Sequence, residues 1–524
     1  MRRMRTLLLL LSTLAVAVLV PAAPASSPPK LDRAVAEWRA HPARSSVRVL
    51  IRTRPGRAVA VLGRLMRTVG PSVMPSSSAD LLVARLSPDS LRAVERDPDV
   101  TRISTDAPVA SLAIEKPQSS LIDRAASLAS FDQSHLLATL GLVAVQDGKF
   151  VRAVPYTGNN VGVAVIDSGL DQNYADLNAV TFYNAVGNII QTPRSDGYGH
   201  GTHVSGLTGS NALASRGDYQ GVAPAVRFIE MRVLDKNGNG YTSDVINAIN
   251  YVVRNKKTLG LGVINLSLGH PIYEPAAFDP LVQAVEAAVR EGIVVVVAAG
   301  NFGGDPIAHV PGYAGITSPG NAPSAITVGA VETYQTNTRS DDVVAWFSSR
   351  GPTWYDGFQK PDIVAPGSHL VSNISPSSTI YQMYPGGRIT AGLMPYFKLS
   401  GTSMSAPVVS GIVATMLEAS TRNGAPLTPN AIKAILQFTA IPLPDHDVLT
   451  QGAGEVNGAG AIVLAAAINP LTTVGSWWLA TGVSPYTVIA GETLSWGQRL
   501  VWSDRVVWGN QVYTNDPAWA TTVV

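Results

Sequence analysis

The sequence predicts an α/β fold with a mostly parallel sheet over residues 158–469, preceded by a small α+β unit over residues 46–106. Short apolar segments alternate with helical patterns in the larger region, and strands that are apolar on both faces belong inside a parallel sheet covered by helices. Polar residues follow several of these segments, at the sheet edge where α/β proteins gather their active residues. The segments predicted as strands are Val161–Ile166, Val226–Arg232, Val263–Leu266, Ile293–Ala298 and Ala325–Val328.

The small unit shows two helical and four extended segments. A strand is predicted over residues 47–52, because Val47, Val49 and Ile51 alternate with Arg48, Leu50 and Arg52. Apolar residues then recur at helical spacing from Ala58 to Val69. A hairpin is expected from Val73 to Leu86, and Ser87 followed by Pro88 is typical of a helix start. With a last strand from Val100 to Ser104, the order is β-α-β-β-α-β, a ferredoxin-like arrangement.

Composition excludes several classes of function. The chain has 524 residues, a formal net charge of +2 and no cysteine. The absence of cysteine excludes disulfides, thiol catalysis and cysteine-ligated metal. Since no long basic run appears, we expect no nucleic-acid partner.

The first residues predict export from the cell. Arg2, Arg3 and Arg5 precede an apolar run from Leu7 to Val20, and the small residues Ala23–Ala25 follow. This pattern is typical of a cleaved secretory signal over residues 1–25. We therefore expect a secreted, extracellular protein with no membrane span after signal removal.

The last segment, residues 470–524, is rich in tryptophan. Six of the nine tryptophans lie there, and Trp496, Trp502 and Trp508 recur at intervals of six as a short degenerate repeat. An even spacing places side chains on one face of an extended chain. This tail could bind a surface or glycan through its aromatic rings, or it could pack against the rest of the protein.

Two polar residues at predicted element boundaries could form an acid–base pair. Asp167 ends an apolar strand, where a carboxylate is costly unless it has a partner, although such a residue is often an ordinary loop aspartate. His200 lies between glycines where a helix begins, which leaves the imidazole approachable. His203 makes a metal pair conceivable, but the spacing and the missing glutamate differ from zinc hydrolases, so we predict no metal.

A serine and an asparagine complete this set. Ser403 precedes an apolar helix predicted over Met404–Ala419, in which Pro407 is tolerable only in the first turn. Its own N–H could then face a developing oxyanion, although a plain helix cap is the commoner role of such a serine. Asn301 follows the strand Ile293–Val297 and could direct an amide at the same oxyanion, or could simply occupy a turn.

Together and in this order, these segments resemble the subtilase family over about residues 158–469. The order Asp, His, Ser along the chain is the subtilisin order. Val408 stands where many relatives have a histidine, and no catalytic loss is expected from it. The matching segments are Thr157–Gly169 for the aspartate, Gly199–Gly206 for the histidine, Asn265–Gly269 for a substrate-binding strand, Ala299–Asn301 for the oxyanion, Phe347–Pro352 and Lys360–Gly367 for the late sheet region, and Gly401–Pro407 for the serine.

The resemblance implies a three-layer subtilisin-like catalytic domain over residues 111–469. It implies a secreted serine endopeptidase that hydrolyses peptide bonds in polypeptide substrates through an acyl-enzyme. The implied site residues are the catalytic triad Asp167, His200 and Ser403, the oxyanion donors Asn301 and Ser403, and the substrate-binding residues Ser267, Leu268, Gly269, Ala299 and Gly300. No cofactor is implied for the chemistry. A structural calcium ion is possible but cannot be identified, because the stretch from Gly209 to Gly221 does not clearly match the family's calcium loop.

By the same resemblance, the unit over residues 46–106 is an inhibitory propeptide, and the enzyme is made as an autoprocessed zymogen. The cut is expected between Asp106 and about Gln118.

Two other functions fit parts of the pattern. A sedolisin-like carboxyl peptidase would share the fold, but it would need an acidic oxyanion residue and a glutamate base in place of Asn301 and His200. An inactive subtilase-like surface-binding protein would explain the tryptophan tail, but all four catalytic elements are intact.

Overall fold

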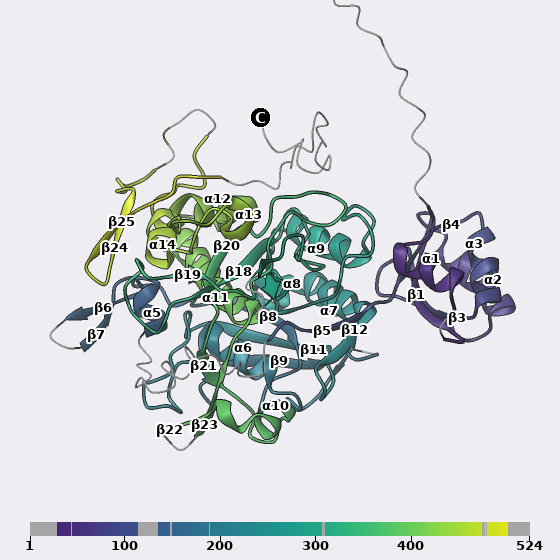
Figure 1. Cartoon of the computed structure of the whole chain (residues 1–524), viewed down its shortest axis with the longest axis horizontal. Helices are drawn as coiled ribbons and strands as arrows, with labels where there is room; N and C mark the ends of the chain where they lie inside the picture. Colours follow the sequence, from purple (N-terminus) through teal and green to yellow (C-terminus); the bar gives the residue numbers. More distant parts are fainter. Residues whose placement is uncertain are drawn as a thin grey trace, which may run out of the picture.

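The computed structural model describes residues 29–42, 44–113, 135–146, 149–187, 189–305, 310–392, 394–473, 477 and 479–500. The predicted signal over residues 1–25 lies outside the described residues, as do Trp478, Trp502, Trp508 and Trp519. Figure 1 shows a small unit, drawn in purple, beside a much larger body.

The small unit has the predicted β-α-β-β-α-β order. Its four strands pair antiparallel in the order β2-β3-β1-β4, and Ser87 caps α3 by accepting the N–H of Ser90. The structure adds an element that the sequence pattern did not indicate, α1, which packs on this sheet beside Leu31. The elements are α1 (Arg33–Ala40), β1 (Val47–Thr53), α2 (Ala58–Thr68), β2 (Val73–Pro75), β3 (Leu81–Leu86), α3 (Pro88–Arg96) and β4 (Val100–Thr105).

The central sheet of the larger body is mostly parallel, as predicted. The strands run in the order β10-β9-β11-β8-β13-β15-β18-β19, with β20 paired to β18, and the pairs β10·β9 and β18·β19 are antiparallel. They are β8 (Gly162–Asp167), β9 (Ala179–Asn184), β10 (Ile190–Gln191), β11 (Arg227–Arg232), β13 (Leu261–Leu266), β15 (Val294–Ala298), β18 (Ile326–Glu332), β19 (Val343–Val344) and β20 (Ile363–Pro366).

Helices cover both faces of this sheet and make three layers. Val163 and Val165 of β8 join one core with α6 and α11, while Ala164 and Ile166 join another with α7 and α9. This alternation is what period-two side-chain geometry requires of a strand buried on both faces. The helices of this body are α5 (His135–Thr139), α6 (His200–Gly209), α7 (Thr242–Arg254), α8 (Lys256–Leu259), α9 (Pro280–Arg290), α10 (Thr379–Met383), α11 (Thr402–Thr421), α12 (Pro429–Thr439), α13 (Val448–Gln451) and α14 (Gly458–Ala467), with a 3₁₀ turn, η1, at Pro385–Gly387.

A separate three-stranded sheet joins the small unit to the larger body. Its middle strand, β5 (Pro108–Ser111), follows β4 closely and lies antiparallel between β12 (Asn239–Tyr241) and β14 (Leu268–Gly269). The outer face of the small sheet also packs on the larger body, since Leu50, Leu81 and Val83 belong to the same apolar core as α7 and α9.

The described part of the tryptophan-rich tail packs against the larger body. Trp496 is buried, meets Phe438 of α12 edge-on, and donates its ring N–H to Thr487. Trp477 is exposed. The remaining strands are β6 (Val143–Gln146), β7 (Lys149–Arg152), β16 (Gly304–Asp305), β17 (Val310–Pro311), β21 (Leu370–Asn373), β22 (Arg388–Ala391), β23 (Met394–Leu399), β24 (Tyr486–Ile489) and β25 (Glu492–Ser495).

Within the described residues, we find no helix that combines the length and apolar character needed to span a bilayer.

Candidate active site

Asp167 and His200 meet at the carboxyl end of the central sheet. Asp167 is the last residue of β8 and His200 the first of α6, and His200 Nδ1 lies 2.7 Å from Asp167 Oδ1. Both side chains are fully buried. Since a carboxylate only accepts, Nδ1 must donate in this bond, which leaves Nε2 as the nitrogen that can take a proton.

Asp196 organises this pair, although the sequence analysis did not single it out. Its carboxylate accepts hydrogen bonds from the backbone N–H of Gly199, from both the N–H and the hydroxyl of Thr202, and from the hydroxyl of Ser168. It thereby ties the start of α6 to the residue after Asp167. Burial raises the pKa of Asp196. An aspartate a few residues before a helix start was the available signal.

Ser403 lies in the first turn of α11, which begins earlier than predicted. The helix starts at Thr402, so Pro407 stands in the second turn, and the prediction that it would lie in the first turn was wrong. The missing N–H of Pro407 leaves the carbonyl of Ser403, four residues earlier, without its helical donor. Ser267 fills this role, because its hydroxyl donates to Ser403 O at 3.0 Å, while the Ser403 hydroxyl donates to Ser267 O at 2.9 Å.

The carbonyl oxygen of Leu112, just after β5, receives both predicted oxyanion donors. Asn301 Nδ2 lies 2.6 Å from Leu112 O, and the backbone N of Ser403 lies 3.3 Å from it. Asn301 is itself held, because its Oδ1 accepts the N–H and hydroxyl of Thr402. Gly401 lets the carbonyl approach, since a Cβ there would stand 2.5 Å from Leu112 O at a φ of +146°. Two donors on one carbonyl oxygen are the arrangement that stabilises charge developing on it.

The segment predicted to bind substrate main chain pairs with β5. Leu268 and Gly269 form β14 and lie opposite Ser111 and Ala110. Ser267 O accepts the N–H of Leu112 at 3.2 Å. The segment of β5 and Leu112 therefore occupies the space between β12 and β14, here called the groove, and ends at the two predicted oxyanion donors.

Ala299 and Gly300, also predicted to bind substrate, lie directly before Asn301. Ala299 O accepts the N–H of Thr317, and Gly300 N donates to the hydroxyl of Thr402. These bonds hold the segment that carries Asn301.

His203 does not form a metal pair with His200. Its Nε2 donates to the carbonyl of Phe397 at 3.0 Å, and burial lowers its pKa to about 3, so the ring is neutral at ordinary pH. Among the described residues, no group of three or more His, Asp or Glu side chains could hold a metal ion.

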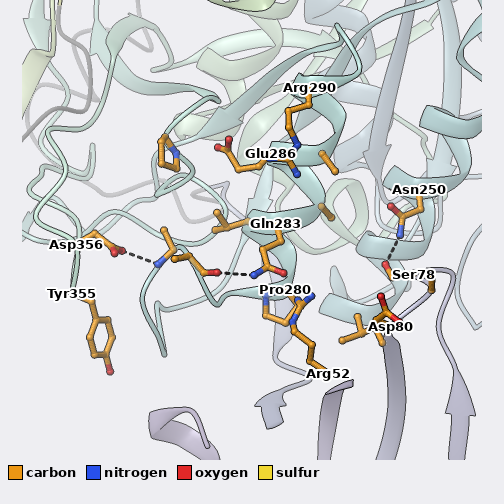
Figure 2. Close-up of a pocket in the computed structure, with 18 of the residues that line it drawn as sticks. Arg52, Ser78, Asp80, Asn250, Pro280, Gln283, Glu286, Arg290, Tyr355 and Asp356 are labelled. Carbon is orange, nitrogen blue, oxygen red and sulfur yellow. Dashed lines mark hydrogen bonds between the residues drawn. The ribbon is translucent and has the colours of Figure 1, made fainter. Parts of the chain in front are cut away.

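A large cavity in the described part of the chain lies away from this site. It measures about 860 Å³ and opens between α9 and the end of the small sheet (Figure 2). None of the predicted site residues lines it, and it includes Arg52, Asp80, Gln283, Tyr355 and Asp356. The groove around β5 is filled by the chain itself.

Charged side chains bind the small unit to the larger body beside this cavity. Arg102 Nε of β4 lies 2.5 Å from Glu274 Oε2, and both side chains are at most 8% exposed. The guanidinium also lies over the ring of Phe278. Burial, together with the charge of Asp279, outweighs the attraction of Arg102 and raises the pKa of Glu274 to about 7.

A second contact holds the start of α7. The carboxylate of Asp106 accepts the N–H of Ser243 at 2.8 Å and pairs with Arg48 at 2.8 Å. An acidic group at a helix N-terminus satisfies free N–H groups and is favoured by the helix dipole.

Comparison with known proteins identifies the family. A profile of the subtilase family, peptidase family S8, matches residues 158–461. The chain is 38% identical to the serine protease AprX of Bacillus subtilis over 58% of this chain and 67% of that protein. It is 38% identical to subtilisin E of the same species over 50% of this chain, although the match spans little more than half, 56%, of that protein.

A solved structure has the same fold. Fervidolysin from Fervidobacterium pennivorans, described as a keratinolytic enzyme related to subtilisin, superimposes with a TM-score of 0.60 at 22% identity, covering 80% of this chain and 61% of the other. The three-layer subtilisin-like fold predicted from the sequence is thereby confirmed. With more than half of its length matched by the family profile, the chain belongs to the subtilase family of serine peptidases.

Proposed function

We propose that this protein is a secreted serine endopeptidase made as a zymogen, and that it cuts its own chain between Leu112 and Ala113. The observation that carries the proposal is the position of the Leu112 carbonyl oxygen, which receives Asn301 Nδ2 at 2.6 Å and the Ser403 N–H at 3.3 Å. When two preorganised donors hold a carbonyl oxygen beside a serine hydroxyl, we expect the peptide bond of that carbonyl to be the one that is cut.

The triad would act in the usual order for this constellation. Ser403 Oγ attacks the Leu112 carbonyl carbon once its proton leaves Ser267 O and passes to His200 Nε2. Asp167 holds the imidazole through Nδ1 and stabilises the imidazolium. The tetrahedral intermediate collapses, the C–N bond breaks, and His200 returns the proton to the amine of Ala113. Water then hydrolyses the Leu112 ester by the same steps.

The same contacts support an inhibitory role for residues 46–106. After the cut, β5 would still lie between β12 and β14 and would keep other substrates out of the groove. The ion pair of Arg102 with Glu274 and the contact of Asp106 with α7 would retain the small unit. Residues 29–113 carry 14 Lys and Arg against 8 Asp and Glu, whereas the whole chain has a net charge of only +2, so the rest of the chain is net negative and attracts this unit.

β12 and β14 would bind the main chain of other substrates, since strand addition recognises peptides largely through backbone hydrogen bonds. This supports action on polypeptides in general. The residues 1–25 support export, and the packing of Trp496 against Phe438 supports a structural role for at least that part of the tail.

The test is expression of the full chain beside Ser403→Ala, with intact mass analysis and a casein assay. The wild type should lose its N-terminal unit and digest casein, and Ser403→Ala should do neither. Ser405→Ala is the matched control, because this buried serine of the same helix bonds Ala365 O and has no part in the proposed chemistry. If Ser403→Ala matured and cleaved casein like the wild type, the assignment of the nucleophile would be wrong.

A further inference from the structure

The residue before Leu112 has a side-chain partner as well as main-chain partners. The hydroxyl of Ser111 lies 3.1 Å from the Tyr198 hydroxyl, and its N–H lies 3.4 Å from Gly238 O. Across the groove, Ser111 lies opposite Leu268 of β14. Ser111 is the second residue on the N-terminal side of the proposed cleavage site. At this position of the strand, the side chain meets a polar side chain of the larger body.

Tyr198 is fixed where it can recognise this position. It is 6% exposed, its backbone N–H donates to Asp196, and its carbonyl accepts the N–H of Ile380. It stands two residues before His200, with the two ring centroids 6.3 Å apart. Asp196, which binds the start of α6, thus positions the tyrosine and the histidine together.

Gly238 makes room for the tyrosine ring. A Cβ at Gly238 would stand 2.4 Å from Tyr198 Cζ and 2.8 Å from its hydroxyl oxygen, closer than real side chains approach. The glycine also has φ +75°, a conformation that other residues rarely adopt. Gly238 therefore has two roles. Its carbonyl accepts the N–H of Ser111, and its lack of a side chain leaves space for the Tyr198 ring, which contacts the Ser111 hydroxyl.

We propose that Tyr198 selects substrates with a hydroxyl-bearing side chain, serine first, at the residue second before the cleaved bond. This inference rests on the proposed endopeptidase function. The small side chain of Ser111 meets the Tyr198 side chain, and its hydroxyl makes a hydrogen bond to the buried tyrosine hydroxyl that an alanine at this position would lose. A neutral hydrogen bond contributes about 0.5–1.5 kcal/mol, which corresponds to about a 2- to 12-fold preference.

The neighbouring positions supply the internal control. Ala110 is exposed in the same strand, whereas Val109 and Leu112 are buried. A serine placed at the position of Ala110 should therefore gain nothing from Tyr198.

The experiment compares the matured wild type with Tyr198→Phe on three fluorogenic peptides. These are Val-Ala-Ser-Leu, Val-Ala-Ala-Leu and Val-Ser-Ala-Leu, each with the reporter amine after leucine. The wild type should show kcat/KM about 2- to 12-fold higher for the first than for the other two. In Tyr198→Phe this ratio should fall to about one, chiefly through slower turnover of the first peptide.

A cycle within the full chain gives an independent readout. Ser111→Ala should slow the proposed self-cleavage by a similar factor in the wild type and by much less in Tyr198→Phe, since the two changes remove the same bond. If all three peptides are cleaved and the preference is absent, or survives in Tyr198→Phe, the inference is overturned while the endopeptidase function stands. If the wild type cleaves no peptide and does not mature, the proposed function itself fails and the inference falls with it.

Discussion

Residues 29–113 touch the rest of the chain in two places, and the two contacts differ in their chemistry. In the groove, β5 is held mainly by backbone groups, through its pairing with β12 and β14 and through the bonds of Leu112 to Ser267, Asn301 and Ser403. On the face formed by α7, α9 and the segment that precedes α9, side chains make most of the contact, including the buried pair Arg102–Glu274.

Under the proposed function, this difference separates two tasks of the same segment, which are self-cleavage and retention of the small unit. Backbone pairing positions a bond for cleavage with little dependence on most side chains, and it is insensitive to pH. The contact at Glu274 depends on the protonation of its carboxyl, because burial favours the neutral form over the charged one. Cutting should therefore respond to changes in the groove, and retention of the small unit should respond to changes on the helix face.

The largest effect is expected from Asn301→Ala. Loss of one oxyanion donor slows acyl transfer by about 100- to 1,000-fold, a range measured on a subtilisin, so self-cleavage and peptide hydrolysis should slow by this factor. Docking of the small unit should stay nearly unchanged. The measurement is the time course of precursor loss after refolding. An equal loss of docking, seen as a small unit that no longer co-purifies with the cleaved enzyme, would contradict the separation of tasks.

Leu112→Asp should slow self-cleavage by about 100-fold or more. Leu112 is 8% exposed, and an unpaired charge in such a site costs several kcal/mol. Ala110→Asp is the matched control, because Ala110 is exposed in the same segment. Pulse-labelled precursor followed by gel electrophoresis measures both rates. If both variants mature equally fast, Leu112 does not occupy the position before the cut.

Raising the pH from 5 to 8 should weaken the binding of the small unit to the cleaved enzyme by about tenfold or more. The pKa of Glu274 is raised to about 7 in the docked state, above its ordinary value of 4.5, chiefly by burial. Release of the small unit is expected to expose this carboxyl and return its pKa toward the ordinary value, so docking should take up a proton. The stabilisation is fully present below the ordinary pKa and is lost as the pH rises through about 7. The measurement is inhibition of the cleaved enzyme by its small unit across this range.

Glu274→Gln, which cannot ionise, should flatten this pH dependence. Asp89→Asn is its control, because the side chain of Asp89 is 88% exposed. A pH dependence that persists unchanged in Glu274→Gln would assign the effect to another group.

The strands and helices were largely predictable because their patterns are local. Val163, Val165, Ala164 and Ile166 alternate between the two cores as a strand buried on both faces requires. The start of α11 was misplaced, because the rule for Pro407 considers only the helix, whereas Ser267 supplies a donor to the carbonyl that the proline leaves free.

The side chains proposed to react were singled out from the sequence, but their arrangement depends on contacts between distant segments. The sequence of residues 108–112 does not predict that this segment fills the groove, because backbone pairing requires no particular pattern of side chains. Asp196 and Tyr198 were missed for a similar reason, because Asp196 also binds Ser168 and Tyr198 meets Ser111, and both contacts join segments that are distant in the sequence. The predicted site residues stay predictions until the variants are made.

The most direct measurement is the C-terminal residue of the first N-terminal fragment released from the full chain, determined by mass spectrometry at early times. A fragment ending at Leu112 is predicted, and it should be absent from Ser403→Ala. Sampling at early times avoids later trimming of this fragment at its C-terminus. A first fragment ending at any other residue would show that the carbonyl held by Asn301 and Ser403 is not the one attacked.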